Sequence, residues 1–159
     1  MVLQPICNPV LSFAPFSGSL SLRKHPNVYT IRASYRDEAA KVMEAKRATG
    51  SDKAVVLHYD DEVGRGNYET AAAAFTDAGL PKPKGVATKR GAAMEPATVD
   101  ALVKDAPHYV LATTQFSQVG DYLKAVEGKP QQVPVAALSF VNPDGLAESL
   151  RNVARGTVV

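Results

Sequence analysis

The sequence lacks several residue types from which binding and catalytic sites are commonly built. Its 159 residues include one cysteine, Cys7, no tryptophan and three histidines. A single cysteine excludes an intramolecular disulfide and a cysteine-cluster metal site. The aromatic content of 7% argues against a base-stacking surface, and the net charge of +2 argues against binding nucleic acid through bulk charge. We therefore expect no nucleic-acid partner.

Long hydrophobic runs are also missing. No apolar stretch approaches the ~18 residues that a membrane helix needs, so we expect no membrane insertion. Residues 1–16 have neither the basic start nor the uninterrupted apolar stretch of a secretory signal, which predicts a cytoplasmic chain if it is expressed as written. With 45% apolar and 21% charged residues, the chain is expected to fold around a buried core as one domain.

Short β-rich runs alternate with stretches of helical apolar spacing. Ser34 is a candidate cap for a helix that Gly50 ends, Asn142-Pro143 is typical of the start of another, and residues 14–26 are expected to form a turn and a connecting segment. Strands are predicted at 9–13, 28–32, 53–59, 85–88, 108–113, 133–138 and 156–159.

From residue 53 onward the alternation of strand and helix is regular. Right-handed crossovers then give a parallel sheet with helices on both faces, and residues 55–57 and 109–111 are continuously apolar, as strands buried on both faces should be. The prediction is an α/β, flavodoxin-like, doubly wound parallel sheet from about Val28 to the end. Counting 53–59 as the first strand, we expect the order 2-1-3-4-5, with Phe75 and Leu111 in the core.

Catalytic constellations are incomplete. Asp60-Asp61-Glu62 after the first strand is typical of magnesium-dependent phosphoacceptor domains, but Thr113-Thr114 ends the third strand where an aspartate is needed. Gly64-Arg65-Gly66 is too short for a dinucleotide fingerprint, and the histidines have no metal spacing. We expect no enzyme activity and no cofactor.

Polar residues instead follow the strands whose carboxyl ends should share one edge of the sheet, where open α/β folds bind ligands. They could hydrogen-bond a small polar ligand, or they could be ordinary capping and turn residues. These residues, with two aromatic neighbours and the loop before residue 20, are Ser17, Ser19, Thr113, Thr114, Gln115, Phe116, Ser139, Phe140 and Asn142.

Segments 9–19, 29–38, 55–64 and 137–141 resemble, in order and spacing, the type I periplasmic binding proteins of the leucine/isoleucine/valine-binding group. The resemblance implies two α/β lobes joined by crossing strands, with ligand closed between them. Residues 1–26 would be a remnant of the first lobe with a crossing segment, and residues 27–159 would be most of the second lobe. The chain would then be a fragment, a truncated reading frame or a degenerate copy.

The same resemblance implies the ligand-contacting positions. Ser17 and Gly18 would meet the ligand carboxylate from the first lobe, and Gln115 or Phe116 would touch it from the second. Val63 stands where some members have a contacting aromatic residue. Ser139 stands where amino-acid binders have a carboxylate for the ligand ammonium, so an α-amino acid fits poorly unless Asp61 or Glu62 substitutes for it. Small organic acids or amides suit this rim equally well.

The function expected from the resemblance is that of the substrate-binding component of an ABC importer, for an amino acid or a related small organic acid or amide. Its partners would be that small molecule and, in the full-length form, an ABC permease, and its location would be the periplasm. A ligand-sensing domain of a receptor or regulator with the same fold is the alternative. A small flavodoxin-like enzyme is a third possibility, for which the sequence offers no nucleotide or metal site.

Overall fold

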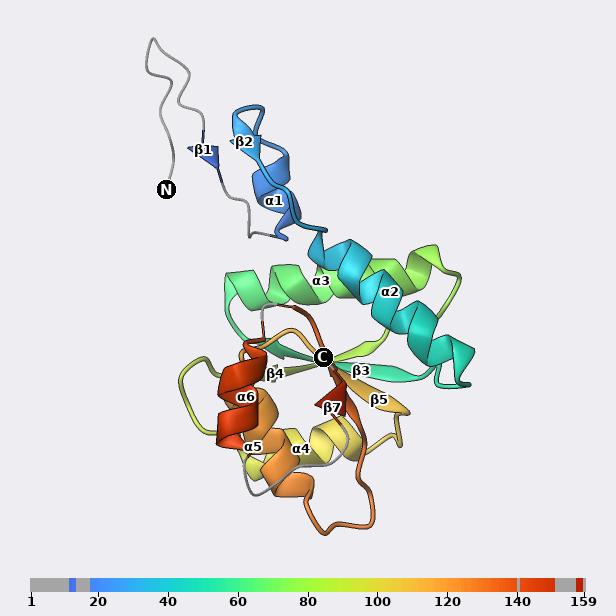
Figure 1. Ribbon diagram of the computed structural model, residues 1–159. Helices are drawn as coiled ribbons and strands as arrows, with labels where there is room; N and C mark the ends of the chain where they lie inside the picture. The colour runs from blue at the N-terminus through green and yellow to red at the C-terminus, as the bar shows by residue number, and fades with distance from the viewer. Residues whose placement is uncertain (1–11, 14–17, 140, 151–156, 159) are drawn as a thin grey trace.

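The computed structural model describes residues 12–13, 18–139, 141–150 and 157–158 (Figure 1). Ser17, Phe140 and Cys7 lie outside the described residues. In chain order the elements are β1 (Ser12–Phe13), α1 (Leu20–Arg23), β2 (Val28–Tyr29), α2 (Tyr35–Ala48), β3 (Ala54–Tyr59), α3 (Glu62–Asp77), β4 (Lys84–Thr88), α4 (Pro96–Val103), β5 (Tyr109–Ala112), α5 (Phe116–Val126), β6 (Val135–Ala137), α6 (Pro143–Ser149) and β7 (Thr157–Val158).

Five parallel strands form the main sheet, in the order β4-β3-β5-β6-β7. This confirms the predicted order 2-1-3-4-5. Val56 of β3 pairs with Gly85 of β4 on one side and with Leu111 of β5 on the other. All four residues of β5 are buried, as its continuous apolar sequence predicted.

Helices cover both faces of this sheet (Figure 1). Helices α2 and α3 pack on one face over a core that contains Phe75 and Leu111, and both side chains are buried as predicted. Helices α4, α5 and α6 contribute Leu102, Val119 and Leu146 to the core of the other face. The chain therefore has the doubly wound architecture that the sequence indicated.

The helix ends follow the capping signals in the sequence. Ser34 forms a capping box at the start of α2, in which its hydroxyl accepts the Asp37 N–H and the Asp37 carboxylate accepts the Ser34 N–H. Asn142 caps α6 in front of Pro143. Gly50, with a φ of 77°, follows α2 in the left-handed region that favours glycine.

The segment before α2 departs from expectation in two respects. Residues 20–23, expected to be part of a connecting segment, form the one-turn helix α1. The strand expected at 28–32 is the shorter β2, which pairs in parallel with β1 in a separate two-stranded sheet and does not join the main sheet. In Figure 1 this small unit extends away from the amino end of α2.

Candidate functional site

The carboxyl ends of β3, β4, β5 and β6 meet at one edge of the main sheet. Successive crossovers run to opposite sides of β3, because β4 lies next to it on one side and β5 on the other. In open α/β sheets, ligands bind in the crevice beyond the carboxyl ends at such a switch point. We call this place, with the loops after the four strands, the carboxyl edge.

Asp61 and Arg90 form an ion pair at the carboxyl edge. Asp61 caps α3: one carboxylate oxygen accepts the Gly64 N–H at 2.7 Å, and the other accepts the Arg90 Nε–H at 2.7 Å. The Arg90 bond, with the Gly64 N–H second, holds the pKa of Asp61 below its usual value. The Asp61 carboxylate is therefore ionised, and both of its oxygens already accept a hydrogen bond.

Tyr59, the last residue of β3, packs its ring against the Arg90 guanidinium. The guanidinium carbon lies 3.8 Å from the centroid of the Tyr59 ring, which is a cation–π arrangement. The Tyr59 hydroxyl accepts the Gln115 N–H at 3.0 Å and donates to Gln118 Oε1 at 2.6 Å. Gln118 is buried and donates to the Ala92 carbonyl. Tyr59 thus joins β3, the loop after β4 and the start of α5.

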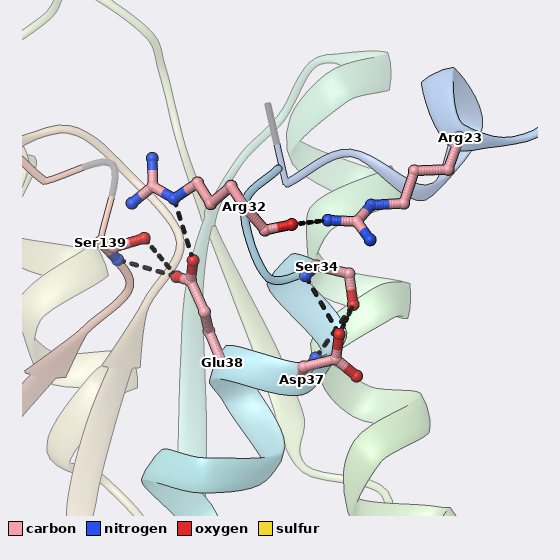
Figure 2. Close-up of polar contacts among 6 residues, drawn as sticks. All are labelled: Arg23, Arg32, Ser34, Asp37, Glu38 and Ser139. Carbon is pink, nitrogen blue, oxygen red and sulfur yellow. Dashed lines mark hydrogen bonds and ion pairs between the residues drawn. The ribbon is translucent and has the colours of Figure 1, made fainter. Parts of the chain in front are cut away.

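Ser139 is held by a glutamate that the sequence did not single out (Figure 2). Its N–H and hydroxyl both donate to Glu38 Oε2, at 3.0 and 2.5 Å. Glu38 Oε1 lies 3.3 Å from Arg32 Nε, and the Glu38 side chain is only 15% exposed. Arg23 in turn donates to the Arg32 carbonyl. A continuous line of contacts therefore connects α1, through the segment before α2, to the loop after β6.

The other predicted site residues are distributed as follows. Glu62 and Phe116 lie in the first turns of α3 and α5, with Phe116 36% exposed and close to Gly145. Gly18 lies outside the main sheet, packed against the start of α2. Its carbonyl accepts the Tyr35 N–H, and a Cβ at this position would come within 2.4 Å of the Tyr35 ring.

The candidate site residues drawn from the sequence did not include Glu38, Tyr59, Arg90 or Gln118. The position of Tyr59 at the end of a predicted strand was an available signal, because strand ends at this edge face the crevice. The other three depend on loop and helix orientations that apolar spacing does not encode.

Among the residues that the structure describes, no cluster of three or more histidine, cysteine or acidic side chains could hold a metal ion. No helix in the described ranges is long and apolar enough to span a membrane. A cavity of about 380 Å³ lies at the opposite edge of the sheet, where Lys53, Lys84, Leu80, Asp105 and Pro107 are among its lining residues.

Comparisons with known proteins gave matches among solved structures alone. No family model matches the sequence, and no curated protein matches it. A possible leucine/isoleucine/valine-binding protein from Rhodopirellula baltica SH 1 matches 91% of this chain and 41% of its own, at 22% identity and a TM-score of 0.81.

Two further matches were solved with small molecules. A branched-chain amino acid ABC transporter protein from Thermus thermophilus, with bound valine, covers 89% of this chain and 38% of its own, at 18% identity and a TM-score of 0.76. A solute-binding protein of an ABC transporter from R. palustris, in complex with benzoate, covers 80% of this chain and 36% of its own, at 17% identity and a TM-score of 0.63.

The chain spans about 40% of the length of the first of these neighbours. The TM-scores over most of this chain show a shared fold. The chain has the α/β fold of one lobe of a type I periplasmic binding protein.

Proposed function

We propose that this chain is the ligand-binding lobe of a two-lobed solute-binding protein that serves an ABC importer and has no catalytic role. The observation that carries the proposal is the likeness over 91% of the chain to a possible leucine/isoleucine/valine-binding protein. The neighbours solved with valine and with benzoate support a small organic ligand. An ABC permease would be the partner of the whole protein, and the periplasm its location.

The two-lobe organisation is part of this proposal. Residues 1–26 would be the remnant of the first lobe with a crossing segment, and residues 27–159 the second lobe. The separate pairing of β1 with β2 supports a second sheet outside the main one. It also favours a boundary a few residues later, between β2 and Ser34, because β2 belongs with β1.

The ligand would bind at the carboxyl edge. Gln115, Phe116 and Ser139 follow β5 and β6 there, while Asp61 and Glu62 follow β3. Ser17 and Gly18 would approach from the first lobe. The exposed Phe116 ring and Val63, which is 64% exposed, supply apolar surface beside these polar groups. Such a mixture of apolar wall and a few polar groups is typical of small-molecule sites.

Titration of the chain followed by two-dimensional amide NMR tests this function. The panel contains monocarboxylates, amino acids, amides, nucleotides and magnesium. We expect at least one small organic compound to shift amide signals of Gln115, Phe116 and Ser139 at the carboxyl edge. Signals of Leu80 and Lys84, at the opposite edge, serve as the internal control. Binding of nucleotide or magnesium alone would contradict the proposal and favour an enzyme or a phosphoacceptor domain.

A further inference from the structure

The carboxylates best placed to meet a ligand at the carboxyl edge are already paired with arginine. Both Asp61 oxygens are used, one by the Gly64 N–H and the other by Arg90. Both Glu38 oxygens are used as well, one beside Arg32 and the other by Ser139 (Figure 2). An ammonium ion approaching either carboxylate would compete with a guanidinium that stays nearby and repels it.

The other acidic side chains in the loops and first helical turns here, Asp60, Glu62, Glu95 and Asp144, are exposed. A contact between an ammonium ion and a solvent-exposed carboxylate is worth only ~0–1 kcal/mol, because water competes for both groups. None of them therefore replaces the enclosed carboxylate that recognition of an α-amino acid requires.

Arg90, by contrast, is held in place and partly exposed. Its Nε is taken by Asp61 and its plane rests on Tyr59. Its two terminal nitrogens make no other hydrogen bond to the residues that the structure describes, and 43% of the side chain is exposed. Gln118 and the Gln115 N–H fix Tyr59 in turn. A planar guanidinium held in this way is pre-organised for a carboxylate, which it can bind through two parallel hydrogen bonds.

We propose that the carboxyl edge selects a small monocarboxylate that lacks an α-ammonium group, and that Arg90 pairs with its carboxylate. The inference rests on the proposed function and specifies its ligand class. Phe116 and Val63 beside the site suit an acid with a branched aliphatic or aromatic body. Arg90 is then a specificity-determining residue, and Tyr59, which acts through it, is a positioning residue.

The test compares two ligands that differ in the ammonium group alone, 4-methylpentanoate and leucine. The 159-residue chain is titrated with each at constant ionic strength, and amide NMR signals give the Kd. We expect 4-methylpentanoate to bind at least ~10-fold more tightly, which corresponds to about 1.4 kcal/mol. Equal or tighter binding of leucine overturns the inference but leaves the proposed function intact. Failure of the whole panel to bind overturns both.

Three variants separate the role of Arg90 from a general charge effect. Arg90→Gln should weaken 4-methylpentanoate binding at least ~10-fold, and it should also reduce the preference over leucine because Asp61 loses its partner. Arg90→Lys keeps the charge but not the fork of donors, so its affinity for 4-methylpentanoate should lie between that of wild type and that of Arg90→Gln. The matched control is Arg65→Gln. It removes an arginine of α3, the helix that Asp61 caps, whose side chain donates to the Asp60 carbonyl.

We expect Arg65→Gln to change the Kd less than ~2-fold, because screening weakens the effect of an exposed charge that does not touch the ligand. An equal loss in the Arg65 and Arg90 variants overturns the inference. Preserved amide spectra and urea midpoints establish that each variant is folded. If Arg90→Gln does not fold, the comparison of Arg90→Lys with Arg65→Gln decides.

Discussion

The two faces of the main sheet are built from different materials. The face under α2 and α3 is rich in small residues, since Ala39, Ala71, Ala74 and Ala136 share its core with larger side chains such as Phe75 and Tyr109. The face under α4, α5 and α6 is rich in valine and leucine. Alanine lets two helices approach closely but leaves little freedom to repack, whereas branched aliphatic side chains can adjust. Equal substitutions on the two faces should therefore have unequal costs.

The largest expected effect is on the alanine-rich face. Phe75→Ala should lower the free energy of unfolding by ~3–5 kcal/mol, because the small alanine side chains of the same core cannot fill the cavity. Leu102→Ala, on the opposite face, should cost about 2–3 kcal/mol, because neighbouring valines and leucines relax into the space. Urea unfolding measures both. Ile31→Ala, at a side chain 80% exposed, is the control and should change stability by less than ~0.5 kcal/mol. A cost below ~1 kcal/mol for Phe75→Ala would count against the burial described here.

Adding volume should show the same contrast. Ala71 is fully buried between the sheet and its neighbouring helix, so Ala71→Leu should cost ~1–3 kcal/mol through overpacking. Ala101 on α4 is partly buried and lines the 380 Å³ cavity, so a leucine there has space to occupy. Ala101→Leu should therefore cost less than ~1 kcal/mol in the same urea experiment. The contrast between the faces would be refuted if the order of the two variants were reversed.

A pair of buried tyrosines sharpens the comparison further. Tyr122 donates its hydroxyl hydrogen bond to the Val133 carbonyl at 3.0 Å, whereas the Tyr109 hydroxyl, on the α2–α3 face, has no partner among the described residues. Burial raises the pKa of each to about 12.

Removing each hydroxyl should therefore have opposite effects. Tyr122→Phe should destabilise by ~0.5–1.5 kcal/mol, because it leaves the Val133 carbonyl unpaired. Tyr109→Phe should be neutral or stabilising by up to ~1 kcal/mol, because it removes a buried polar group that makes no bond. Thermal unfolding near neutral pH measures both. A destabilisation in Tyr109→Phe equal to that in Tyr122→Phe would reveal an unrecognised partner for Tyr109.

A further prediction concerns the cap of α2, a helix that packs on the alanine-rich face. Ser34→Ala should cost ~1 kcal/mol at pH 7 through loss of the capping box. Hydrogen bonds from the Ser34 hydroxyl and N–H lower the pKa of Asp37. Asp37 therefore contributes stability above its unfolded pKa of about 3.9, and this contribution is lost as the pH falls through its lower folded pKa.

The pH dependence gives this prediction a second readout. The difference in stability between wild type and Ser34→Ala should shrink as the pH falls from 5 toward about 2. Once Asp37 is protonated, the hydrogen bond that the Ser34 hydroxyl donates to its carboxylate no longer stabilises a charge. Thr49→Ala at the other end of α2 removes a hydroxyl that bonds the Lys46 carbonyl, and it should show no such dependence. Urea midpoints at several pH values measure this. A constant difference would mean that Asp37 does not act through Ser34.

The sequence predicted the fold correctly where apolar residues recur with the spacing of a helix or a strand. The apolar runs of β3 and β5, the spacing that buries Ala71 and Phe75, and the caps at Ser34 and Asn142 led to the correct order of the five strands. Each of these features is local, and each reports which side of an element faces the core.

The carboxyl edge could be located from the sequence, but its pairings could not. Glu38 reaches Ser139 across 101 positions, and Arg90 reaches Asp61 from the loop after another strand. Neither contact leaves a periodic trace, because it depends on loop conformation and on the angle at which a helix leaves the sheet. In the unit formed by β1, α1 and β2, the strands were predicted at 9–13 and 28–32, but α1 and the pairing of the strands apart from the main sheet were missed for a related reason. Its elements are too short to show a period.

The order β4-β3-β5-β6-β7 has a consequence for how the chain is assembled during synthesis. Synthesis makes residues available from the N-terminus onward, so once residue 112 is available, β3 can pair with β4 on one side and with β5 on the other. Strand β6 then covers the free edge of β5, and β7 covers that of β6. Each later strand protects an edge that would otherwise recruit another chain. The growing polypeptide never has to insert a strand between two that are already paired.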